Sequence, residues 1–282
     1  MTLEIFLLIL LAAALHAGWN AIVKMRGDRL VIMGLIAAAG GIIFLPGLFL
    51  FPAPAPEVWP LLALSIAIRC LYSFFLCYAY DNGDLGQVYP IARGTAPLLV
   101  ALGAFVLVGE SLSFVALLGI LCLVAGVLSL IFDHGAMWRQ NSQAIIYALL
   151  TALCIAAYTV VDGIGVRNSG SVMGFAAWLT VGDGIFLFAL AAVLRGKTVV
   201  RVAKENLAAC CIGGLMQAGA YWIIIVALAV APMAMVSALR ETSVLFAAIL
   251  STFILKEGMG VWRFISASLI TLGMVIMRSD KS

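Results

Sequence analysis

The chain has 282 residues, of which 65% are hydrophobic and only 10% are charged, and its formal net charge is +3. A soluble domain is nearer one-quarter charged, and so few polar residues would not cover the surface around an aqueous core. This composition excludes a disordered protein and nearly every soluble enzyme. The small net charge, without a basic run, also excludes a nucleic-acid-binding protein. A polytopic membrane protein remains, and at ~20 apolar residues per crossing the length allows about ten helices.

The apolar residues fall into stretches that are continuous rather than alternating, which favours membrane-spanning helices over the strands of a barrel. In chain order these stretches are Leu3–Val23, Leu30–Leu50, Val58–Tyr80, Gln87–Val108, Leu112–Phe132, Gln143–Val161, Val172–Leu194, Leu207–Ala229, Met233–Leu255 and Val261–Met277. We therefore predict an all-α integral membrane protein with ten transmembrane helices.

The two halves of the chain resemble each other at an ungapped offset of 147 residues. This offset aligns Arg93 with Arg240 and Glu110 with Glu257. In so apolar a chain, two matched charges favour a true repeat. Because each half has five helices, the second half is inserted upside down relative to the first. We predict two inverted five-helix repeats, 1–132 and 143–277, an arrangement typical of transporters with a midplane site. Duplication kept for stability alone is the alternative.

Several ionisable side chains lie deep inside the predicted spans. They are His16, Arg69, Arg93, Asp183, Arg240 and Glu241. A charge at such depth costs at least ~2.5–3.5 kcal/mol on insertion scales, so each is expected to face a partner or a wet cavity. Three arginines set against two carboxylates leave one positive charge over, which would suit a substrate anion.

Arg93 and Arg240 are the strongest candidates for substrate binding, because the repeat places them at equivalent positions. A guanidinium keeps its charge and forms two parallel hydrogen bonds with a carboxylate or phosphate. The pair predicts a site for a small anion or for the anionic end of a zwitterion. Alternatively, Glu241 and Asp183 neutralise the two arginines.

Asp183 lies between two glycines in the middle of the seventh stretch. It is interpreted either as a structural ion-pair partner or as a carboxylate that carries a coupling proton. Glu241, His16 and Arg69 are further candidates for coupling or charge pairing.

Aromatic and polar side chains inside the spans complete the candidate site. They are Trp19, Asn20, Tyr72, Tyr158, Gln217 and Tyr221. Aromatic walls with a few polar groups suit a small metabolite, although packing is the alternative role for each of these residues.

Motifs for metal binding, catalysis or ATP hydrolysis are missing from the sequence. The six cysteines form no CxxC pair, and there is neither an HExxH motif nor a P-loop. We expect no cofactor, no metal and no enzyme activity. The expected partners are a small-molecule substrate and the lipid bilayer, with no nucleic acid. Two fused halves make a monomer sufficient, and a homodimer is the open alternative.

Short motifs carry a resemblance to a known family. They are Leu15–Lys24 in the first helix, Ala227–Pro232 before the ninth, the pairs Gly109-Glu110 and Lys256-Glu257, and the glycines Gly119, Gly126 and Gly273. On these features the chain resembles the EamA-like ten-helix permeases of the drug/metabolite transporter (DMT) superfamily over essentially its whole length. It is also similar to an EamA-like subgroup associated with phosphonate utilisation.

This resemblance implies a permease of the bacterial inner (plasma) membrane, with a central cavity lined mainly by helices one, three, four, six, eight and nine. Sugar-phosphate and nucleotide-sugar carriers, its distant relatives, hold anionic ligands with residues of helices four and nine, where Arg93 and Arg240 lie. The leading expectation is a secondary active transporter of a small anionic or zwitterionic metabolite, namely an amino acid, organic acid or phosphonate, working by alternating access. A proton-coupled exporter of drugs or other cationic compounds, centred on Asp183 or Glu241, is the alternative.

Overall fold

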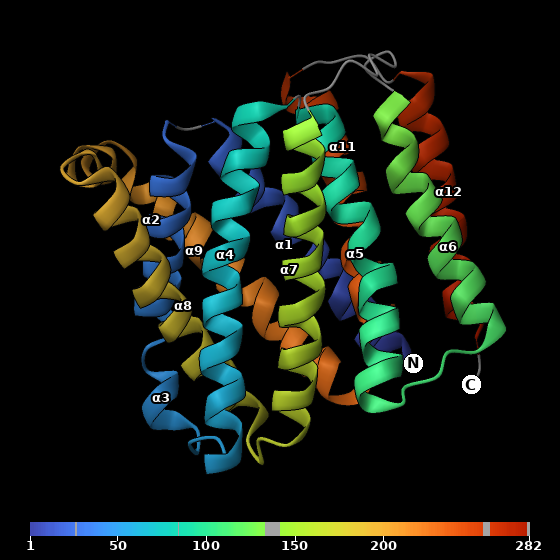
Figure 1. Cartoon of the computed structure of the whole chain (residues 1–282), viewed down its shortest axis with the longest axis horizontal. Helices are drawn as coiled ribbons and strands as arrows, with labels where there is room; N and C mark the ends of the chain where they lie inside the picture. The colour runs from blue at the N-terminus through green and yellow to red at the C-terminus, as the bar shows by residue number, and fades with distance from the viewer. Residues whose placement is uncertain (26, 84, 133–141, 256–259, 281–282) are drawn as a thin grey trace.

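The computed structural model describes residues 1–25, 27–83, 85–132, 142–255 and 260–280, and within them the chain is helical with no β-strand. The helices pack side by side in one bundle, and both termini lie at the same end of it (Figure 1). The α-helices are α1 Leu3–Met25, α2 Arg29–Phe44, α3 Gly47–Leu50, α4 Trp59–Asn82, α5 Leu85–Val108, α6 Phe114–Ser129, α7 Ser142–Arg167, α8 Val172–Arg195, α9 Thr198–Val230, α10 Met233–Arg240, α11 Ser243–Leu255 and α12 Val261–Ser279. Two short 3₁₀ helices, η1 Pro56–Val58 and η2 Leu130–Phe132, complete the elements.

Within the described residues, 9 helical stretches are long and apolar enough to cross a membrane. They correspond to nine of the ten predicted spans, so the predicted all-α integral membrane fold is confirmed. The remaining prediction, one continuous helix over Met233–Leu255, is wrong, because α10 ends at Arg240 and α11 begins at Ser243. The amides of Glu241 and Thr242 bond to carbonyls three residues back, at 3.0 and 3.1 Å, which tightens the chain between the two helices.

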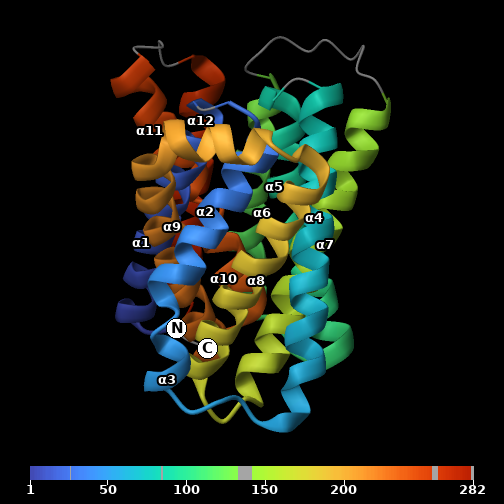
Figure 2. The ribbon, with the colours of Figure 1, turned by 90° about the vertical axis from the view of Figure 1, so that its left-hand side faces the viewer.

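Two other helices are longer than predicted. Helix α7 continues six residues past Val161, which brings Asp162 inside the bundle. Helix α9 begins nine residues before Leu207 and kinks at Asn206, where φ is −128° and ψ is 15°. The segment before the kink runs across the end of the bundle (Figure 2).

Polar side chains cap the first turns of several apolar helices. Oδ1 of Asp28 accepts the N–H of Val31 at 3.2 Å at the start of α2. Oγ of Ser113 does the same for α6, and Oγ of Ser171 for α8. A helix leaves its first amides without intrahelical partners, so these caps set where the helices begin.

Glycines let neighbouring helices approach closely. A methyl group on Gly184 would lie 2.7 Å from the carbonyl oxygen of Ala37, so α8 can rest against α2 only because position 184 has no side chain. This contact holds the neighbouring residue, Asp183, beside α2. At the crossing of α6 and α12, Gly126 faces Ile270 and Gly273 faces Leu123. Glu257, which the predicted repeat aligns with Glu110, lies outside the described residues.

Candidate functional site

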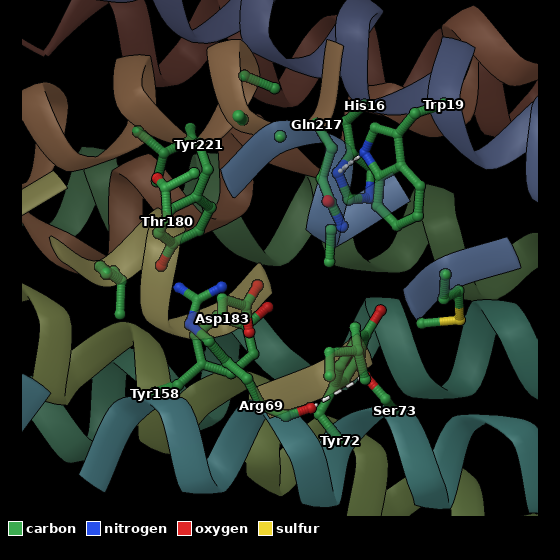
Figure 3. A pocket seen from close by; sticks show the side chains of 18 of the residues that line it. His16, Trp19, Arg69, Tyr72, Ser73, Tyr158, Thr180, Asp183, Gln217 and Tyr221 are labelled. Atoms are coloured by element: carbon green, nitrogen blue, oxygen red, sulfur yellow. Dashed lines mark hydrogen bonds between the residues drawn. The ribbon is translucent and has the colours of Figure 1, made fainter. Parts of the chain in front are cut away.

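A cavity with a free volume of about 70 Å³ lies between α1, α2, α4, α7, α8, α9 and α10. Its polar and aromatic wall consists of His16, Trp19, Arg69, Tyr72, Ser73, Tyr158, Thr180, Asp183, Gln217, Tyr221 and Arg240. Figure 3 shows the first ten of these around the open space. One water needs roughly 10–15 Å³ of such volume, so the cavity has room for several waters or part of a small solute.

Arg69 and Asp162 form an ion pair at one wall of the cavity. Nη2 of Arg69 lies 2.7 Å from Oδ2 of Asp162, and the hydroxyl of Tyr221 donates to the same oxygen. Arg69 lines the cavity, whereas Asp162 does not and is 0% exposed. The pair thus presents the arginine to the cavity while its charge is already balanced.

Arg93 and Glu241 form a second buried ion pair, with Nε 2.6 Å from Oε2. The pair joins α5 to the break between α10 and α11. Neither residue lines the cavity. Of the two arginines that the predicted repeat aligns, the structure therefore places only Arg240 on the cavity wall, and no described side chain of helix α5 lines the cavity.

Arg240 ends α10 with its guanidinium at the cavity and is 4% exposed. Nη2 of Arg240 donates to the hydroxyl of Tyr158 at 2.9 Å. Among the described residues, no carboxylate lies within 4 Å of it. Its charge is therefore positioned by a neutral hydroxyl.

Asp183 contributes a negative charge to the wall of the same cavity. Over the described part of the chain it has no ion pair within 4 Å and no hydrogen bond through its side chain. Its carboxylate lies near Arg69, with the aromatic rings of the cavity around it (Figure 3). Within the described residues, Asp183 is thus a carboxylate in the cavity wall with no cationic side chain within 4 Å.

The first helix adds a polar wall. Nε1 of Trp19 donates to Nδ1 of His16 at 3.2 Å, so a neutral His16 carries its proton on Nε2. Asn20, which the sequence proposed as a binding residue, instead donates to the carbonyl of His16 at 2.8 Å and does not line the cavity. Gln217, Tyr72 and Tyr221 line the cavity.

Asp162 is the charged residue that the sequence analysis missed. The predicted span ended at Val161, one residue before it, because hydropathy falls there. Within the described residues, the expected balance of three arginines against two carboxylates is therefore corrected to three against three, with no positive charge left over. The available signal was the spacing from Tyr158, because residues four apart lie on the same face of a helix and Asp162 follows Tyr158 at that spacing.

Membrane-crossing helices around a small cavity with charged walls are typical of membrane transport proteins, in which buried charges mark substrate and ion pathways. The model of the EamA-like transporter family matches residues 142–279. This stretch is just under half of the chain; it is similar to that family of membrane transporters, and the likeness is consistent with the drug/metabolite transporter superfamily.

A solved structure described only as "Crystal structure of protein" has the same fold, with a TM-score of 0.76 and 19% sequence identity. The match covers 97% of this chain and 94% of that chain. At this level of identity it shows the fold alone. Among curated proteins, no sequence matches the chain.

Proposed function

We propose that the chain is a secondary active transporter that moves a small zwitterionic metabolite across the bacterial inner membrane by alternating access. The observation that carries this proposal is the contrast between the four paired and two unpaired charges around the cavity. Within the described residues, Arg240 and Asp183 both line the cavity and neither has an oppositely charged partner within 4 Å. Arg69 and Arg93 each have one.

The two unpaired groups fit the two ends of a zwitterion. A carboxylate or phosphonate binds a guanidinium through parallel hydrogen bonds, which suits Arg240. An ammonium group binds a carboxylate and also the faces of aromatic rings, which suits Asp183 among Tyr72 and Tyr221. Because a buried unpaired charge is costly, a ligand that carries both charges compensates both groups at once. Amino acids and aminophosphonates are the substrates of this kind.

Packing between the two halves supports alternating access. A twofold relation between them would pair the second span with the seventh and the fifth with the tenth, and α2 does pack on α8 and α6 on α12. At the latter crossing the contacts are reciprocal. A methyl group on Gly126 would lie 2.9 Å from the amide nitrogen of Ile270, and one on Gly273 would lie 2.8 Å from that of Leu123. The 147-residue offset exchanges these two contacts, as a twofold axis does.

A second contact supports the same axis. Sγ of Cys122 lies 3.4 Å from the carbonyl oxygen of Leu269, and these two residues are 147 apart. Equivalent residues can touch only where the axis passes between them. The broken α10–α11 element adds the discontinuous helix that inverted-repeat transporters place beside their substrates.

A matched set of three-carbon ligands tests the proposal. β-Alanine, propionate, malonate and propylamine share a size but differ in charge, and 2-aminoethylphosphonate with ethylphosphonate extends the test to phosphonates. Ligand binding raises the melting temperature of a purified transporter, and at equal ligand concentration the increase is larger for the ligand that binds more tightly. We expect the two zwitterions to stabilise the protein most and to enter proteoliposomes. Equal or stronger effects of the singly charged ligands, or no effect of any ligand, would contradict the proposal.

The cationic alternative has one observation in its favour, which is that Asp183 lies unpaired among aromatic rings. Propylamine and a lipophilic cation such as tetraphenylphosphonium test it. If these cations bind more tightly than β-alanine, and Asp183→Asn abolishes their binding while Arg240→Gln does not, a proton-coupled exporter replaces the zwitterion transporter.

A further inference from the structure

We propose that Asp162 is a specificity-determining residue of this transporter. Asp162 neutralises Arg69 from outside the cavity wall. The described part of the cavity then has one unpaired cation, Arg240, and one unpaired anion, Asp183. This balance selects a net-neutral ligand over a dianion. This inference rests on the proposed function and extends it to a residue that the ligand does not touch.

Asp162 lies where it can set charge without binding substrate. It is fully buried on α7, outside the cavity wall, while its partner Arg69 is on the wall with an 11% exposed side chain. A ligand therefore meets the guanidinium and not the carboxylate. The contribution of Asp162 to ligand binding is electrostatic, and it reaches the cavity through Arg69.

The Arg69 guanidinium is held so that it stays paired. Its Nε donates to Oγ of Ser65 at 3.3 Å, and its Nη2 faces Asp162. The guanidinium carbon also lies 4.0 Å from the ring centre of Tyr221 and 4.5 Å from that of Tyr158. Contacts from α4, α7 and α9 thus fix both the position and the direction of this arginine.

The buried charge of Asp162 lowers the stability of the fold unless it is fully compensated, so packing alone does not explain this residue. Oδ1 of Asp162 is buried without a hydrogen-bond partner among the described residues, so only one of its two oxygens is compensated. Buried ion pairs are often replaceable by apolar residues without loss of stability. A charge with this cost is better explained by what it does to the cavity.

Loss of the Asp162 charge would give the cavity a second uncompensated guanidinium. In a medium of low dielectric constant, the interaction of a buried charge with a ligand a few ångströms away is strong. With Arg69 and Arg240 both uncompensated, the cavity would attract a second negative charge on the ligand. The preferred ligand would then change from a zwitterion to a dianion.

The test uses Asp162→Asn, which keeps the shape and the acceptor for Tyr221 while removing the charge. Dissociation constants of β-alanine and malonate are measured by calorimetry on the purified, full-length protein. We expect malonate to bind more tightly to the variant than to the wild type. The ratio of the malonate to the β-alanine dissociation constant should fall at least about tenfold, which corresponds to about 1.4 kcal/mol.

A double variant separates charge balance from damage. Arg69→Gln combined with Asp162→Asn removes both members of the pair, so the wild-type charge of the cavity returns and the ratio should return to within about threefold of the wild-type value. Arg69→Gln alone leaves Asp162 uncompensated and should shift preference toward propylamine. Asp28→Asn breaks the surface ion pair with Arg195 and should leave the ratio unchanged.

The outcomes are distinguishable from those of the proposed function. If wild type prefers β-alanine and Asp162→Asn weakens all ligands equally, Asp162 has only a structural role and the inference is wrong. If wild type does not prefer β-alanine, the proposed function fails, while the change in malonate affinity still tests Asp162. If Asp162→Asn does not fold, Arg69→Gln decides, because an unchanged charge preference there overturns the inference.

Discussion

Nε of Arg93 lies 2.6 Å from Oε2 of Glu241, and this ion pair joins the middle of α5 to the break between α10 and α11. Both side chains are almost completely buried, at 3% and 0% exposed. The predicted repeat aligns Arg93 with Arg240, yet within the described residues only Arg93 has a carboxylate partner. The two arginines therefore have different roles: Arg93 holds a broken helix in place, and Arg240 presents its charge to the cavity.

Breaking this pair should cost much of the stability. Glu241→Gln leaves the Arg93 guanidinium buried without a counter-charge, which typically lowers the free energy of unfolding by about 3–5 kcal/mol. Denaturant titration in detergent measures the loss. Glu4→Gln, at an exposed position in the first turn of α1, is the control and should have little effect. Arg93→Met together with Glu241→Leu should recover most of the stability, and a Glu241→Gln protein as stable as wild type would refute the assigned role.

Tyr158→Phe should weaken ligand binding without unfolding the protein. The hydroxyl of Tyr158 accepts from Nη2 of Arg240 at 2.9 Å, and a hydrogen bond to a charged group contributes about 1.5–3 kcal/mol. Water can replace the lost hydroxyl and recover part of this binding free energy, so we expect about a tenfold loss of affinity for β-alanine. Calorimetry measures it. Tyr147→Phe, on the same helix but outside the cavity, should leave the affinity unchanged; equal effects of the two substitutions would contradict the positioning role.

Arg167→Lys should destabilise the end of the bundle at which the termini lie. The guanidinium of Arg167 donates to the carbonyls of Leu228 and Ala231 at 2.9 and 2.8 Å and pairs with Glu110 at 3.0 Å. A single ammonium cannot reach these three partners in a fixed fork, so carbonyls at the end of α9 lose their donors. We expect a loss of about 1–2 kcal/mol, read from the melting transition.

The matched control for this prediction is Arg195→Lys. Arg195 is also in an ion pair, with Asp28 at 2.7 Å, but both side chains are substantially exposed. Exposed pairs contribute little, so this substitution should change stability by less than about 0.5 kcal/mol. If both substitutions cost the same, the carbonyl contacts of Arg167 are not what matters.

Gly184→Ala should destabilise the protein, because the added methyl group would lie 2.7 Å from the backbone oxygen of Ala37 and force α8 away from α2. Overpacking of this kind costs about 1–3 kcal/mol. Gly219→Ala is the matched control, since a methyl group there would meet nothing within 4 Å. It should be neutral or slightly stabilising, as alanine is the better helix former. Thermal unfolding of the two variants, side by side, measures the difference.

The sequence predicted the number and order of the spans well, since hydropathy is a local property and each helix satisfies its own backbone. Besides the start of α9, it failed at two places where a charge interrupts the pattern. The ninth span breaks at Glu241, and the sixth continues past Asp162. In both places a buried arginine from another helix, Arg93 or Arg69, compensates the carboxylate. Hydropathy counts such a carboxylate as exposed because it does not include the partner.

Composition and hydropathy thus determined by themselves that the chain is a helical membrane protein, and the depth of its charged residues pointed to the candidate site. Only the tertiary structure decided which charges are paired. Arg69 and Arg93 have carboxylate partners 93 and 148 positions away in the chain, whereas Arg240, within the described residues, has a tyrosine hydroxyl and no carboxylate. Depth in the membrane follows from a residue's place along its own helix. Pairing follows from how different helices are packed, and the balance of charge in the cavity depends on that packing.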